Sequence, residues 1–279
     1  MITQLPTVEL FGLQIVAASE DDFWRFLRKE LGEWRKNNGV RLLMTPNPEQ
    51  IMLAESNRDF KADLEEADFL IPDGAGLVWA SKYFYNLKLR ERKCEGRIAG
   101  SDTVAKIIAW SKKEKWKVLV VGGYYEDKVV KGEGGELGEV RMIKMENGEE
   151  LGWIEGYERV AESQAKEEEE KTRMAIESWR PDIVLVAFGA PWQERWLVER
   201  REFLTENGVR LGMAIGGSVD FLTGKVARAP KIMQKSGTEW LFRLIKQPWR
   251  WQRQLALGKF LGLVADEANK ELRARTLRK

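Results

Sequence analysis

The segment 69–76, FLIPDGAG, places a carboxylate between an apolar run and a glycine-rich turn. The run 69–71 is typical of a buried strand, and the glycines that follow are typical of a tight turn into a helix. Asp73 is therefore expected at the carboxyl end of a parallel strand, the edge at which open α/β sheets bind ligands. An equally weighted interpretation is that Asp73 only caps the helix expected from about residue 76.

The same strand-then-turn pattern recurs along the chain. Expected strands lie at 40–44, 69–71, 117–121, 183–188 and 209–215, and expected helices at 48–66, 76–86, 102–115, 158–179 and 192–206. Continuous apolar strands that alternate with helices predict an α/β, Rossmann-like, mostly parallel sheet with helices on both faces. The turns at 73–74, 122–123, 189–191 and 216–217 should then cluster at one edge of that sheet. Residues 140–145 alternate like a short strand, and the Gly-rich, charged segment 131–139 is expected to be a loop.

The composition is that of a folded, soluble protein. Of 279 residues, 43% are hydrophobic and 32% charged, and the one cysteine, Cys94, cannot form an internal disulfide. Residues 1–18 lack the pattern of a signal peptide, and no transmembrane segment is expected. The chain contains no histidine. Any proton chemistry near neutral pH therefore needs another base, and a positioned carboxylate is the leading substitute.

The net charge of +2 conceals a strong asymmetry. Residues 225–279 carry 14 Lys and Arg against 4 Asp and Glu, a net of +10, while residues 1–224 carry −8. We therefore divide the chain into a catalytic domain, 1–224, and a basic, aromatic, helical appendage, 225–279, with Pro248 as a break between helices. Basic and aromatic side chains together suit an anionic bilayer surface, and nucleic acid less specifically. The simplest alternative is an ordinary helical tail with solvated charges.

Polar side chains follow the other expected strands as well. In TPNPEQ (45–50), Thr45 and Asn47 would display a hydroxyl and an amide beside Asp73, although either could simply cap the next helix. In RIAGSD (97–102), Arg97 brings a bidentate donor to a helix N-terminus, which favours anions.

Two further turns complete the expected edge. In AFGAPWQE (187–194), Gln193 can read a sugar or base edge, while Glu194 is interpreted as no more than favourable charge at a helix start. In IGGSVD (215–220), Gly216 and Gly217 allow a backbone to approach a ligand closely, with Asp220 next to them. None of these turns is a Walker loop or has GxGxxG spacing. Together they point to a polyanionic, sugar-bearing ligand such as a nucleotide sugar.

Metal chemistry is not expected. Without histidine and with one cysteine a zinc site is nearly excluded, and no Asp-x-Asp pair follows a strand to clamp magnesium. We predict neither a metal nor another cofactor.

The motifs TPNPEQ, IPDGAG, RIAGSD, AFGAPWQE and IGGSVDFLTGKVARAP occur in an order that resembles the WecG/TagA/CpsF glycosyltransferase family over roughly residues 10–250. The resemblance implies an inverting, metal-independent transfer of a sugar, often N-acetylmannosamine, from a UDP-sugar to N-acetylglucosamine on undecaprenyl diphosphate, for wall teichoic acid or surface polysaccharide. It assigns the active-site Thr and Asp to Thr45 and Asp73. By the same resemblance, the substrate-binding positions fall on Asn47, Arg97 and Gln193 and, in the appendage, on Arg228, Arg243 and Arg250.

The expected mechanism is a single displacement. Asp73 takes the proton from the acceptor hydroxyl, and helix N-termini and arginines meet the charge on the departing UDP. We expect a cytoplasmic protein attached peripherally to the inner face of the cell membrane, with no nucleic-acid partner; self-association is left open. Two alternatives remain: a Rossmann-like nucleotide-binding oxidoreductase, against which the missing GxGxxG counts, and a basic-tail nucleic-acid-binding protein.

Overall fold

The structure is a computed structural model that describes residues 5–34, 39–131, 138–156, 162–225 and 251–277, together with Pro230, Met233, Phe242 and Leu244. In these residues one mixed sheet has ten strands in the order β1-β2-β4-β3-β10-β9-β5-β8-β7-β6. The strands are β1 (Thr7–Leu10), β2 (Leu13–Val16), β3 (Arg41–Met44), β4 (Phe69–Leu70), β5 (Val118–Val121), β6 (Val129–Lys131), β7 (Arg141–Lys144), β8 (Glu150–Ile154), β9 (Ile183–Val186) and β10 (Leu211–Ala214).

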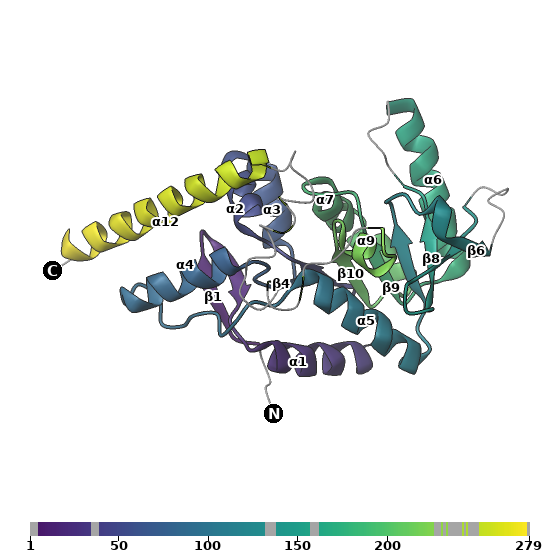
Figure 1. Cartoon of the computed structure of the whole chain (residues 1–279), viewed down its shortest axis with the longest axis horizontal. Coiled ribbons are helices and arrows are strands. Elements are labelled where there is room, and N and C mark those ends of the chain that lie inside the picture. Colours follow the sequence, from purple (N-terminus) through teal and green to yellow (C-terminus); the bar gives the residue numbers. More distant parts are fainter. Residues whose placement is uncertain are drawn as a thin grey trace.

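Helices cover both faces of this sheet, as predicted (Figure 1). They are α1 (Glu20–Gly32), α2 (Pro48–Ser56), α3 (Arg58–Glu65), α4 (Ala75–Asn86), α5 (Gly100–Glu114), the short 3₁₀ helix η2 (Glu126–Lys128), α6 (Glu162–Trp179), α7 (Trp192–Glu199), α8 (Arg201–Glu206), α9 (Ser218–Leu222) and α12 (Trp251–Leu277).

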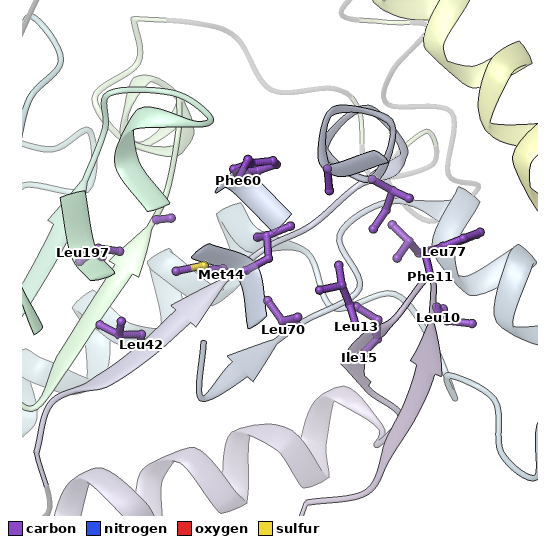
Figure 2. Close-up of a cluster of buried hydrophobic side chains, with 14 of the residues drawn as sticks. Leu10, Phe11, Leu13, Ile15, Leu42, Met44, Phe60, Leu70, Leu77 and Leu197 are labelled. Atoms are coloured by element: carbon purple, nitrogen blue, oxygen red, sulfur yellow. The ribbon is translucent and has the colours of Figure 1, made fainter. Parts of the chain in front are cut away.

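The protein has two hydrophobic clusters, one on each face of the sheet, and each lies between the sheet and the helices that cover that face. One cluster joins α2, α3, α4, α7, α8 and α12 to the sheet, and Figure 2 shows its part around Met44, Phe60 and Leu70. The other joins α1 and α5 to the opposite face through residues such as Phe23 and Ile107. Side chains of a strand alternate between the two faces, so Leu42 and Leu43 belong to different clusters.

The central strands are parallel, so their carboxyl ends share one edge. Strand β3 pairs with β4 and β10, β9 pairs with β10 and β5, and all four pairings are parallel. The turns that follow these strands, at 73–74, 122–123, 189–191 and 216–217, therefore lie along that edge. The predicted clustering is confirmed.

Several elements differ from the sequence-based expectation. The expected helix 48–66 is broken at Asn57, whose side chain accepts a hydrogen bond from the Phe60 N–H and starts α3. The expected helix 192–206 is divided at Arg200 into α7 and α8. The expected strand 140–145 is confirmed as β7, whereas strands β1, β2, β6 and β8 and helix α1 were not anticipated. Residues 132–137 of the expected loop lie outside the described residues.

Helix α12 packs against the body of the protein. Phe260, Val264 and Ala268, at four-residue spacing, are buried in the same cluster as the residues of α2 and α4. The Phe260 ring lies edge-on to the Phe11 ring, with centroids 5.6 Å apart. Arg90, in the segment after α4, forms an ion pair with Glu271 of α12, in which Arg90 Nη1 lies 2.7 Å from Glu271 Oε1. The helix expected after Pro248 is confirmed as α12, and the division at 224/225 stays a prediction.

Candidate active site

Asp73 lies after β4 and forms an ion pair with Arg97. The Arg97 Nη2 and Nε atoms lie 3.1 and 3.3 Å from the Asp73 Oδ1 atom, and both side chains are about one-quarter exposed, 23% for Arg97 and 27% for Asp73. The residue before α4 is Gly74, and no side chain in the described part of the protein caps that helix. The capping interpretation of Asp73 is therefore wrong, and the carboxylate stays at the strand edge.

The backbone holds this carboxylate beside Thr45. Strands β3 and β4 are in register at Met44 and Leu70, and the Asp73 N–H donates to the Pro46 carbonyl at 3.1 Å. The Ile98 N–H donates to the Pro72 carbonyl, also at 3.1 Å, which ties the segment that carries Arg97 to the same turn. The structure thus brings Thr45, Asp73 and Arg97 together from three separate segments.

The Thr45 side chain sits against the first residue of α5. A Cβ built on Gly100 would lie 3.1 Å from Thr45 Cγ2 and 3.3 Å from Oγ1, which is tighter than ordinary packing. Gly100 therefore lets α5 begin directly over Thr45. The first N–H groups of a helix have no intrahelical acceptor and attract anions.

Asn47 caps helix α2. Its Oδ1 accepts hydrogen bonds from the N–H groups of Glu49 and Gln50 at 2.9 and 3.1 Å. The capping interpretation of Asn47 is confirmed. Because the oxygen is used in this way, only the amide Nδ2 donors of Asn47 would be available to a ligand, and substrate binding by Asn47 stays a prediction.

Gln193 links two turns of the sheet edge. Its Oε1 accepts from the Gly216 N–H at 2.9 Å and from the Gly189 N–H at 3.2 Å, so it bridges the turns after β10 and β9. Its Nε2 donates to Glu194 Oε1 at 2.9 Å. Gln193 is buried, with 3% of its surface exposed. Most of its hydrogen-bonding capacity therefore holds the edge together, and one amide hydrogen remains for a ligand.

Glu194 is a buried acid that also receives the side chain of Gln50. The Gln50 Nε2 donates to Glu194 Oε1 at 3.0 Å, which connects α2 with α7 across the end of β10. Among the described residues, the other oxygen, Oε2, is buried and has no hydrogen-bond partner, and the same holds for Gln50 Oε1. Burial raises the pKa of Glu194 to about 7, which favours its neutral form relative to an exposed carboxyl group. A neutral carboxylic acid can lie there without a counter-ion.

Asp220 lies at the far end of the edge, in the first turn of α9. Its Oδ1 accepts a hydrogen bond from the Tyr125 hydroxyl at 3.1 Å. Burial and the Asp220 carboxylate raise the pKa of Tyr125 well above its usual range, so the phenol remains a donor. A Cβ on Gly217 would lie 3.0 Å from Asp220 Oδ2, so this carboxylate turns back over its own turn. Ligand binding by Gly216, Gly217 and Asp220 stays a prediction.

The three appendage arginines, Arg228, Arg243 and Arg250, lie outside the described residues. Within the described part of the chain, no group of three or more Cys, Asp or Glu side chains is placed to hold a metal ion. In the same part of the chain, no helix has the length and apolarity needed to cross a bilayer.

Two polar residues of this edge, Glu194 and Gln50, are not predicted as site residues from the sequence. The sequence analysis treats Glu194 as no more than favourable charge at a helix start, although helical spacing back from Leu197 places it on the buried face with Gln193. Gln50 carried no signal of its own, because its role depends on a partner 144 positions away.

Comparison with known proteins identifies the family of this chain. Residues 8–274 match the Glycosyl transferase WecG/TagA/CpsF family, so the match includes most of α12. A relative from Bacillus subtilis (strain 168), the N-acetylglucosaminyldiphosphoundecaprenol N-acetyl-beta-D-mannosaminyltransferase, is 32% identical over 232 residues. That alignment covers 82% of this chain and 81% of the relative. The chain therefore belongs to the WecG/TagA/CpsF family of glycosyltransferases.

Proposed function

We propose that this protein transfers N-acetylmannosamine from a UDP-sugar to N-acetylglucosamine carried on undecaprenyl diphosphate, as a step in teichoic acid or surface polysaccharide synthesis. The placement of Asp73 carries the proposal: a carboxylate at the strand edge, held by Arg97 and adjacent to Thr45. The name of the Bacillus subtilis relative supports the choice of sugar and acceptor.

In the proposed reaction, Asp73 removes the proton of the attacking acceptor hydroxyl. The hydroxyl oxygen forms a bond to the anomeric carbon while the bond from that carbon to the diphosphate breaks, and UDP leaves with the bonding electrons. A β-linked product from an α-linked nucleotide sugar requires this single inversion. General-base assistance of this kind typically contributes about 10²–10⁴-fold to the rate.

The departing diphosphate needs positive charge at the same edge. We assign this charge to the N-terminus of α5, which begins over Thr45, and to the Arg97 guanidinium, which pairs with Asp73. Arg228, Arg243 and Arg250 are proposed to add to them when the acceptor is bound. On this account the transfer needs no metal ion.

A panel of UDP-sugars, assayed with a short-chain, water-soluble N-acetylglucosaminyl diphosphate acceptor, tests the proposal. We expect transfer from UDP-N-acetylmannosamine with inversion of the anomeric centre. Transfer from another UDP-sugar would correct the donor. Failure with every donor, together with binding of NAD or salt-sensitive binding of DNA, would instead favour one of the two alternative classes of function.

A further inference from the structure

Helix α4 presents an exposed aromatic face that the proposed chemistry does not use. Its inner side is buried, whereas Trp79, Tyr83 and Tyr85 are 44%, 37% and 40% exposed. The Trp79 and Tyr83 rings are stacked, with centroids 5.5 Å apart. We call Trp79, Lys82, Tyr83 and Tyr85 the aromatic face of α4.

Many of the exposed large hydrophobic side chains belong to α4 or to the neighbouring helix α12. Among the described residues, α4 carries three of them and its neighbour α12 three more, Leu261, Leu272 and Leu277. Helix α12 touches both ends of α4, because a Cβ on Gly76 would lie 3.6 Å from the Phe260 ring and Arg275 Nη1 donates to the Lys88 carbonyl at 2.7 Å. Figure 1 shows the two helices extending at the same end of the molecule.

The charge around the aromatic face is positive. Residues 75–93 contain five Lys or Arg and one acidic residue, and Lys82 is exposed among the rings. The Lys93 Nζ lies 5.0 Å from the centre of the Tyr85 ring. In a symmetric dimer through this face, Lys82 and its basic neighbours would meet their own copies, which is unfavourable. An anionic bilayer instead accepts the rings at headgroup depth and attracts the lysines.

The aromatic face of α4 lies on the helix that begins next to the proposed base. Helix α4 begins at Ala75, two residues after Asp73, so one end of the helix lies at the proposed base. An acceptor on a polyprenyl diphosphate presents its sugar just above the bilayer surface. We propose that the aromatic face of α4 rests on an anionic bilayer and thereby holds Asp73 at the height of the lipid-linked acceptor. This inference rests on the proposed function.

The single cysteine permits a local test. Cys94 is buried, so a cysteine introduced at exposed Asn86 can be labelled selectively with a polarity-sensitive dye. We expect Asn86→Cys to change its emission on addition of phosphatidylglycerol vesicles, and the change to weaken with salt. The matched control, Lys113→Cys in the last turn of α5, should not respond. A protein that binds the vesicles with no change at residue 86 would overturn the proposal.

Removal of the Trp79 and Tyr83 rings gives a second test of the proposal. The double variant Trp79→Ala/Tyr83→Ala should bind vesicles about tenfold more weakly and lose transfer to a vesicle-embedded acceptor in proportion. Its transfer to the soluble short-chain acceptor should match wild type. If the double variant also loses activity on the soluble acceptor, the rings belong to the acceptor site. If the dye at residue 86 responds to protein concentration without lipid, the face binds a second copy of the protein. Either result contradicts the membrane role. Failure of the proposed function is distinct, because wild type would then be inactive on the soluble acceptor.

Discussion

The Arg97 guanidinium contacts a single oxygen of Asp73, with Nη2 at 3.1 Å and Nε at 3.3 Å from Oδ1. Two donors on one oxygen fix the direction of the carboxylate more firmly than one long bond could. In the proposed reaction, the same guanidinium also supplies positive charge to the departing diphosphate. We therefore expect Arg97 to act on both the base and the leaving group.

Arg97→Lys tests whether these roles need the planar guanidinium or only its positive charge. Lysine keeps the charge but loses the planar pair of donors, and hydrogen bonds to charged groups are worth about 1.5–3 kcal/mol. We expect kcat/KM to fall about 10- to 150-fold, with an increased KM for the UDP-sugar, in steady-state assays. Arg92→Lys, exposed in the same loop, is the control and should behave as wild type. An Arg97→Lys enzyme with unchanged kinetics would show that the ion pair has no catalytic role.

The pKa of Glu194 predicts a pH-dependent contribution to stability. Its folded-state pKa is about 7 against an ordinary 4.5, so the folded protein holds the proton more tightly than the unfolded chain. The contribution is fully present below pH 4.5 and is lost as the pH rises to about 7. The 2.5-unit difference between these two values corresponds to about 3 kcal/mol.

Glu194→Gln removes this titration while keeping the shape and one acceptor. The free energy of unfolding of wild type, measured in urea, should decrease between pH 5 and pH 7 relative to that of Glu194→Gln. Glu202→Gln, at an exposed position of α8, should leave the pH dependence of wild type unchanged. Parallel pH profiles for wild type and Glu194→Gln would mean that Glu194 is ionised in the folded protein throughout this range.

Helix α12 offers a matched pair of neighbouring residues. Phe260 is fully buried against Phe11, whereas Leu261 is 47% exposed. Phe260→Ala should lower the free energy of unfolding by about 3–5 kcal/mol, and Leu261→Ala by no more than about 0.5 kcal/mol. Equal effects in urea unfolding would mean that α12 does not pack on the body in solution.

This packing changes how the appendage should be tested. Truncation after Gly224 would remove Phe260 and expose its partners in α2 and α4, so lost activity could reflect lost stability. Single substitutions of Arg228, Arg243 or Arg250 to Gln avoid that difficulty. If these arginines contact a diphosphate, each variant should lose activity on the soluble acceptor while its unfolding midpoint stays unchanged.

Metal independence is a direct consequence of the proposed leaving-group stabilisation. Transfer should continue at an undiminished rate in excess EDTA, measured with the soluble acceptor so that vesicles are not perturbed. Loss of activity that one divalent ion restores would require a metal in place of the helix N-terminus and arginines.

Much of the fold follows from local sequence, because apolar runs such as those of β5 and β9 and the turns after them are local signals. Strands β1 and β2 were missed since each is four residues long and makes its pairing across the Phe11-Gly12 turn. The break at Asn57 was readable as a cap but was masked by the helical pattern on either side. Contacts such as Phe260 with Phe11 could not be predicted, because they depend on residues far apart in the chain.

The residues of the candidate site also divide into those with a local sequence signal and those whose role depends on distant partners. Asp73, Thr45 and Arg97 each follow a strand or precede a helix, so their shared edge could be predicted from the sequence. The partners that hold Gln193 are backbone N–H groups and the buried Glu194, and only the folded structure identifies them. Polar residues that serve the fold and those that serve a ligand look alike in the sequence.

Asp73→Asn tests the central claim most directly. Asparagine keeps the shape and a hydrogen-bonding oxygen but cannot accept the proton of the acceptor hydroxyl. Single-turnover transfer to the soluble acceptor, measured alongside UDP-sugar affinity, should show a rate lower by about 10²–10⁴-fold with affinity essentially unchanged. A variant that transfers sugar at nearly the wild-type rate would contradict the assignment of Asp73 as the general base.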